Sequence, residues 1–148
     1  MVTIDRATEA DAETISALLG EIEAYYGGEN VPGDLAQVRA ALFSARPAAT
    51  VLLARDGENV VGMASYTFLW PASGADTSLY LKELYVREDA RRHGVARALM
   101  DALRDEATSA GCSRVEWTAD RDNPTALAFY EAMGAEENQG KVFYRSER

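Results

Sequence analysis

The sequence predicts an α/β fold in which helices cover a mixed β-sheet. Asp56-Gly57 joins two apolar runs, 50–55 and 59–70, and this dipeptide is a strong signal for a β-hairpin. Strand-like and helix-like segments then alternate through the second half of the chain, which is typical of strand–helix–strand units. The 148 residues are enough for one core of useful size, so we expect a single domain over 1–148.

The first half of the chain begins with an alternating segment, 2–6, that predicts a short strand. Thr8 to Asp11 resembles a capping box, and apolar residues follow at helical spacing until Gly27-Gly28. Asp34 is a suitable cap for a second helix, which ends before Pro47.

The second half contains an apolar strand, 79–86, and an amphipathic helix, 95–110, closed by Gly111. A strand at 115–118 comes next. Asn123-Pro124 then opens a helix that ends at Gly134, with Asn as the cap and Pro in the first turn. We expect a last strand over 141–145.

The chain is acidic, with a net charge of -9. This charge argues against nucleic acid and anionic membranes as partners, and it favours a cationic small molecule such as an amine. Solubility alone explains the acidity equally well. The N-terminus is charged and lacks an apolar signal region, and no apolar run approaches ~20 residues. These features predict a cytoplasmic protein.

Cys112 is the single cysteine, so no intrachain disulfide can form. We expect it to be a packed residue rather than a nucleophile. His93 is the single histidine, and no other His or Cys lies at ligand spacing, so we expect no metal.

One basic segment interrupts the acidic chain. Residues 87–97 hold four arginines against two acids, and the turn 91–96 fits the pattern R-x-x-G-x-A. The turn lies between a strand and a helix, where unpaired N–H groups, the helix dipole and the cations favour phosphate. Gly94 lets the backbone approach a ligand closely. A turn glycine among solvated arginines is the alternative, and neither a P-loop nor a dinucleotide fingerprint is present.

Three segments together resemble the GNAT superfamily of acetyl-CoA-dependent N-acetyltransferases: LKELYV (81–86), RRHGVA (91–96) and NPTALAFYEAMGA (123–135). The resemblance implies the single-domain acyl-CoA N-acyltransferase fold, with about seven strands and about four helices. It also implies acetyl-CoA as cosubstrate, an amine acceptor and, as is common in the superfamily, a homodimer. The resemblance to the diamine and polyamine branch is weaker.

The resemblance also implies where acetyl-CoA binds. Its pantetheine would lie along Leu84, Tyr85 and Val86, pairing with their backbone like an added strand. Asn123 is a helix cap, and the resemblance implies that its side chain also contacts acetyl-CoA. The pyrophosphate would take backbone N–H groups and positive charge from the turn, which comprises Arg91, Arg92, His93, Gly94, Val95, Ala96 and Arg97.

Two residues are candidates for catalysis. The resemblance implies that Tyr130 assists the departing thiolate, whereas helical spacing alone is also typical of a core aromatic. Glu83 is the candidate base, acting directly or through water, because an ammonium of pKa ~10 must lose a proton before attack. Glu83 is equally suited to an ordinary ion pair with Lys82 or Arg87. Polyamine relatives often carry two acids where this chain has Lys82-Glu83.

Arg92 stands where many relatives have glycine, and a positive φ there would strain it by ~1–2 kcal/mol. Acids and tyrosines at the end of the first helix are candidates for the acceptor site: Glu21, Glu23, Tyr25 and Tyr26. Two other functions stay open, acetylation of protein lysines or N-termini and CoA binding without catalysis.

Overall fold

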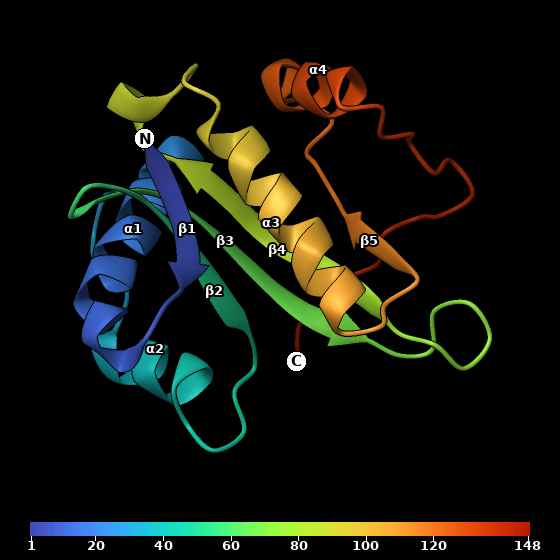
Figure 1. Cartoon of the computed structure of the whole chain (residues 1–148), viewed down its shortest axis with the longest axis horizontal. Helices are drawn as coiled ribbons and strands as arrows, with labels where there is room; N and C mark the ends of the chain where they lie inside the picture. The colour runs from blue at the N-terminus through green and yellow to red at the C-terminus, as the bar shows by residue number, and fades with distance from the viewer. The chain divides into compact units, whose positions relative to one another are not determined.

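The computed structural model describes residues 1–148 as two compact units, Met1–Trp117 and Thr118–Arg148. The first unit contains one five-stranded sheet with the order β1-β2-β3-β4-β5 (Figure 1). Neighbours from β1 to β4 are antiparallel, and β5 is parallel to β4, so the sheet is mixed as predicted. The strands are β1 (Val2–Arg6), β2 (Thr50–Asp56), β3 (Asn59–Leu69), β4 (Ser78–Val86) and β5 (Arg114–Trp117).

Helices cover both faces of this sheet. The helices of this unit are α1 (Ala12–Tyr25), α2 (Leu35–Leu42) and α3 (Val95–Ser109), with short 3₁₀ turns at Glu9–Asp11 and Glu88–Ala90. α1 and α2 share one core with alternate residues of β2 and β3, including Ile15, Val38, Val51 and Met63. α3 crosses the other face (Figure 1).

Close packing of α3 depends on Gly62 of β3. A Cβ atom added at Gly62 would lie 3.3 Å from Val95 Cγ1 and 3.4 Å from Leu99 Cδ1. Val95 and Leu99 belong to the buried stripe of α3, which is 3% exposed or less at both residues. The start of α3, directly after the basic turn, is therefore held firmly against the sheet.

The helix and turn signals in the sequence are confirmed. The Thr8 N–H donates to the Asp11 carboxylate at 2.9 Å, and Asp34 Oδ1 accepts from the Gln37 N–H at 2.9 Å. Gly57 in the hairpin has φ 63°. These contacts are local, which is why short sequence patterns could predict them.

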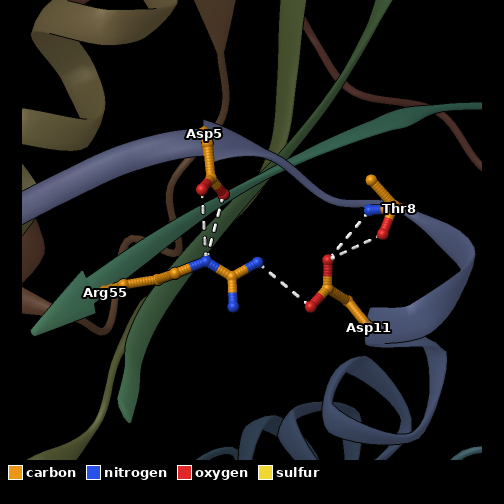
Figure 2. A network of polar contacts seen from close by, with 4 residues as sticks. All are labelled: Asp5, Thr8, Asp11 and Arg55. Carbon is orange, nitrogen blue, oxygen red and sulfur yellow. Dashed lines mark hydrogen bonds and ion pairs between the residues drawn. The ribbon is translucent and has the colours of Figure 1, made fainter. Parts of the chain in front are cut away.

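Arg55 of β2 joins the first strand to the start of α1 (Figure 2). Its Nε donates to both carboxylate oxygens of Asp5 at 3.2 Å, and its Nη2 donates to Asp11 Oδ1 at 3.0 Å. Asp11 also receives the Thr8 N–H. Burial raises the pKa of Asp11, but these hydrogen bonds and the Arg55 charge outweigh it and bring that pKa below 3.8.

A β-bulge changes the direction of one candidate residue. Ser65 of β3 pairs with Glu83 of β4, but the next residue, Tyr66, pairs with Leu81, so Lys82 is the extra residue. The side chains of Glu83 and Leu81 therefore face opposite sides of the sheet, although they are two residues apart. Glu83 faces α1 and α2, where it lines a pocket.

β4 and β5 pair over only four residues. Their ladder runs from Ser78–Arg114 to Leu81–Trp117 and stops there. β4 continues to Val86, so its last five residues extend beyond its parallel neighbour. The edge of β4 at residues 84–86 is therefore not paired with β5.

The second unit contains α4 (Pro124–Ala132), the fourth α-helix of the chain. The expected strand at 141–145 does not form, and the sheet has five strands rather than about seven. Val142, Phe143 and Tyr144 are exposed in this segment. The segment has strand-like composition, but a strand also requires a neighbour for its backbone hydrogen bonds, and residues 141–145 pair with none. None of the helices has the length and apolar character needed to cross a bilayer.

Candidate active site

The basic turn has two left-handed residues directly before the start of α3. Arg91 is extended, whereas Arg92 and Gly94 are left-handed, with φ 66° and 78°. Such turns point successive N–H groups into one concavity. The Ala98 N–H donates to the Gly94 carbonyl at 3.0 Å, and no side chain caps α3. The N–H groups of 95–97 thus precede the first intrahelical bond, where a helix favours negative charge.

Arg92 has the positive φ that the sequence analysis named as a source of strain. A residue with a Cβ at this φ is strained by ~1–2 kcal/mol. The side chains of Arg92, His93 and Arg97 are exposed around the turn, and Arg97 Nε lies 3.8 Å from Asp101 Oδ1. The Val95 side chain packs in the core, where the residue is 3% exposed. Only the Val95 backbone therefore faces the turn.

The Arg91 side chain folds back over the end of β4. Its Nε donates to the Val86 carbonyl at 2.9 Å. Its guanidinium carbon lies 5.1 Å from the ring centre of Tyr25 and 5.7 Å from that of Tyr85. Arg91 therefore links the turn to α1 and β4, and both tyrosines stabilise its charge.

A second polar network lies beside Arg91, and the sequence did not predict it. Arg87 Nη2 donates to Glu21 Oε2 at 2.9 Å, and the Tyr85 hydroxyl donates to Glu21 Oε1 at 3.2 Å. Arg87 Nη1 also donates to the Val60 carbonyl at 2.9 Å. Burial, followed by the Glu21 charge, raises the pKa of Tyr85, so its phenol remains a neutral donor.

A pocket of about 320 Å³ opens on the α1 and α2 side of the sheet. Glu83 and Ser65 contribute polar groups from the sheet, and most of the remaining wall is apolar. Gly33 lies at the edge of the pocket and is tied to α1, because its N–H donates to the Ser16 carbonyl at 2.9 Å and its carbonyl accepts from Ser16 Oγ. The pocket is thus held open by the fold itself.

The pocket differs from the expected acceptor site in its lining. Its α1 residues are Ile15 and Leu19, in the middle of the helix. The expected residues near the end of α1 are not in the lining, and Glu21 and Tyr25 instead contact Arg87 and Arg91. Helical periodicity alone did not show which stretch of α1 would border an opening.

Asn123 and Tyr130 belong to the second unit. Asn123 caps α4, because its Oδ1 accepts from the Ala126 N–H at 3.1 Å and Pro124 occupies the first turn. The Tyr130 ring lies 5.3 Å from the Phe129 ring, in a tilted arrangement. The cap is confirmed, and the contacts of both residues with acetyl-CoA stay predictions. No group of three or more His, Cys, Asp or Glu side chains is placed to hold a metal ion.

Comparison with known proteins identifies the class. The model of the acetyltransferase (GNAT) family matches residues 16–135. The chain therefore belongs to the GNAT acetyltransferase family, as its motifs indicated. An integron cassette protein from the mobile metagenome of V. cholerae has the same fold, with a TM-score of 0.86 and 32% identity, over 99% of this chain and 93% of that one.

Two curated relatives match half of the chain. An L-ornithine N5-acetyltransferase of Arabidopsis thaliana is 34% identical over 77 residues, which are 52% of this chain and 34% of that protein. A thialysine N-epsilon-acetyltransferase of Caenorhabditis elegans is 31% identical over 77 residues, 52% of this chain and 48% of that protein. The matches therefore span half or less of each relative.

Proposed function

We propose that this protein transfers an acetyl group from acetyl-CoA to a primary amine of a small molecule by direct attack. One observation carries the proposal. β4 connects three features in one stretch of chain: the basic turn before α3, a strand edge that β5 leaves unpaired and the Glu83 carboxylate in the pocket. The turn would suit a phosphate, the strand edge an extended amide chain, and the pocket carboxylate an amine.

Acetyl-CoA suits the donors that this chain presents. The N–H groups at the start of α3 would hold the pyrophosphate, with charge from Arg92 and Arg97. The β4 edge at 84–86, which β5 leaves unpaired, would pair with the pantetheine amides, and the Val86 carbonyl there already accepts from Arg91 Nε. The cosubstrate supplies the activated acetyl group, and backbone groups at 84–86 would stabilise charge on its carbonyl oxygen.

Glu83 would take the proton of the acceptor amine, directly or through water. A primary ammonium has a pKa near ~10, so little free amine is present at neutral pH. The bulge at Lys82 turns the Glu83 carboxylate toward the pocket and away from the α3 core. A C–N bond then forms, the thioester C–S bond breaks, and the leaving thiolate takes up a proton.

The small size of the pocket favours a small acceptor over a protein. A peptide lysine would need an open groove for its backbone, whereas the opening beside Glu83 is bounded by two helices and the sheet. CoA binding without catalysis is the other alternative. It predicts CoA affinity with no turnover on any amine.

Replacement of Glu83 by Gln tests the catalytic proposal. We expect kcat/KM at pH 7 to fall by about 10²-fold or more, since general base catalysis contributes ~10²–10⁴-fold. The loss should shrink as the pH approaches 10, where the amine is already neutral. The assay is thiol release from acetyl-CoA over a panel of amines.

The control for this variant is CoA affinity by calorimetry, which should be unchanged in Glu83→Gln. Equal kcat/KM values for the variant and the native protein would remove Glu83 from the mechanism. A native protein that neither binds CoA nor releases thiol with any amine would refute the proposed function.

A further inference from the structure

The pocket beside Glu83 has two chemically different ends. Toward the sheet it offers the Glu83 carboxylate and the Ser65 hydroxyl. Its body is walled by aliphatic side chains such as Leu19 of α1, Leu42 of α2 and Met63 of β3. A ligand that fills it must therefore carry one cationic end and an apolar remainder.

The other polar residues of the pocket lie together where α2 begins. These are Asp34 and Gln37, and the Asp34 carboxylate already accepts the Gln37 N–H at 2.9 Å as the helix cap. Asp34 is exposed, and its carboxylate is bonded to the helix start through Oδ1. The aliphatic wall between α2 and β3 has no comparable group for a second ammonium.

Size and polarity together disfavour acceptors with many polar groups. The volume of about 320 Å³ lies at the small end of the ~300–1,000 Å³ typical of ligand pockets. Each amino or hydroxyl group buried without a partner costs roughly 2–7 kcal/mol. Aminoglycosides carry many such groups, and a diamine held at Glu83 meets aliphatic carbon along the pocket body and a second carboxylate only at Asp34.

We infer that the acceptor is a monoamine with an apolar alkyl or arylalkyl body. This inference rests on the proposed function and narrows its acceptor class. The amino group meets Glu83, and the body fills the space between α1, α2 and the sheet. Selectivity then comes from apolar burial rather than from recognition of a second charge.

A series of unbranched primary amines, from ethylamine to octylamine, tests the inference on the native protein. We expect kcat/KM to rise about 4-fold per methylene until the pocket is full, the factor given by burial of one CH₂ group. Thiol release at saturating acetyl-CoA is the readout. A flat or falling series would overturn the inference.

Pentylamine and 1,4-diaminobutane form a matched pair, because they differ only in a terminal methyl or ammonium group. We expect pentylamine to be preferred at least 10-fold. Equal values, or a preference for the diamine or for kanamycin, would refute the apolar acceptor and leave the acetyltransferase proposal intact. Failure with every amine would instead refute the proposed function.

A pair of variants locates the selectivity. Leu42→Asp places a carboxylate on the half-buried wall and should shift the pentylamine-to-diaminobutane ratio at least 10-fold toward the diamine. Ala40→Asp adds the same charge on an exposed position of α2 that does not line the pocket, and should leave the ratio unchanged. Equal shifts in both variants would contradict the assignment. If Leu42→Asp does not fold, the amine series still decides.

Discussion

Arg92 combines a strained backbone with an exposed cationic side chain. Its φ of 66° is a conformation that glycine adopts without cost. Strained residues occur often at functional sites, and this one lies in the turn that we propose to bind the pyrophosphate. Arg92 thus lowers the stability of the fold and places a positive charge beside the start of α3.

Arg92→Gly should separate these two effects. We expect the variant to be about 0.5–1 kcal/mol more stable, because relief of strain exceeds the added entropy of the unfolded chain. CoA should bind about 3-fold more weakly, the size of one exposed ion pair. Urea unfolding and calorimetry measure the two quantities.

Arg92→Lys is the matched control, since it keeps both the charge and the Cβ. It should resemble the native protein in stability and in CoA affinity. A destabilised Arg92→Gly would show that the strain argument is wrong. An unchanged affinity would show that Arg92 does not contribute to phosphate binding.

At the scale of elements, polar side-chain networks attach α1 to the strands, which the backbone hydrogen bonds of the sheet do not do. Arg87 and Tyr85 of the β4 end bind Glu21 of α1, and Arg55 of β2 binds Asp11 at the start of the same helix. The two anchors lie near opposite ends of α1. They fix the helix that forms one side of the pocket.

The Asp11 network predicts a pH-dependent contribution to stability. The pKa of Asp11 is below 3.8 in the folded protein, so its contribution is complete above that pH and is lost as the pH falls through the lowered pKa. Asp11→Asn should cost about 1.5–3 kcal/mol at pH 7, the range for hydrogen bonds to a charged group. The deficit should shrink below pH 3.8.

Chemical unfolding at pH 7 and at pH 3 measures this difference. Asp5→Asn provides a comparison, because the Asp5 side chain is 54% exposed whereas that of Asp11 is 15% exposed. The Asp5 variant should lose less stability at pH 7. An Asp11→Asn deficit of equal size at both pH values would contradict the assigned network.

At the scale of the whole molecule, the described contacts form two units, and the candidate catalytic residues are divided between them. Glu83 belongs to Met1–Trp117, and Tyr130 belongs to Thr118–Arg148. Kinetic measurements are therefore the test of the role proposed for Tyr130. A phenol of pKa ~10 can assist a thiolate of pKa ~8.5 as a hydrogen-bond donor.

Tyr130→Phe removes only the hydroxyl group. If that group assists thiolate departure, kcat should fall about 10-fold or more, and CoA affinity should change little. Phe129→Leu, which keeps the Tyr130 hydroxyl, is the neighbouring control. An unchanged kcat from pH 7 to pH 9 in Tyr130→Phe would remove the residue from the mechanism.

Features that depend on near neighbours along the chain could be predicted from residue identity. The caps at Asp34 and Asn123, the turn at Gly57 and the family motifs are all of this kind. Each is a contact among a few consecutive residues, so residue identity at fixed spacing suffices. The expected strand at 141–145 does not form, because a strand needs a neighbour from elsewhere in the chain and this segment pairs with none.

The groups that meet at the site are set by long-range packing. The bulge that turns Glu83 into the pocket depends on the register with β3, and the open edge of β4 depends on where β5 stops pairing. Glu21 reaches Arg87 across 66 positions of sequence. Strand register and helix packing arise from contacts between distant segments, which residue spacing alone does not specify.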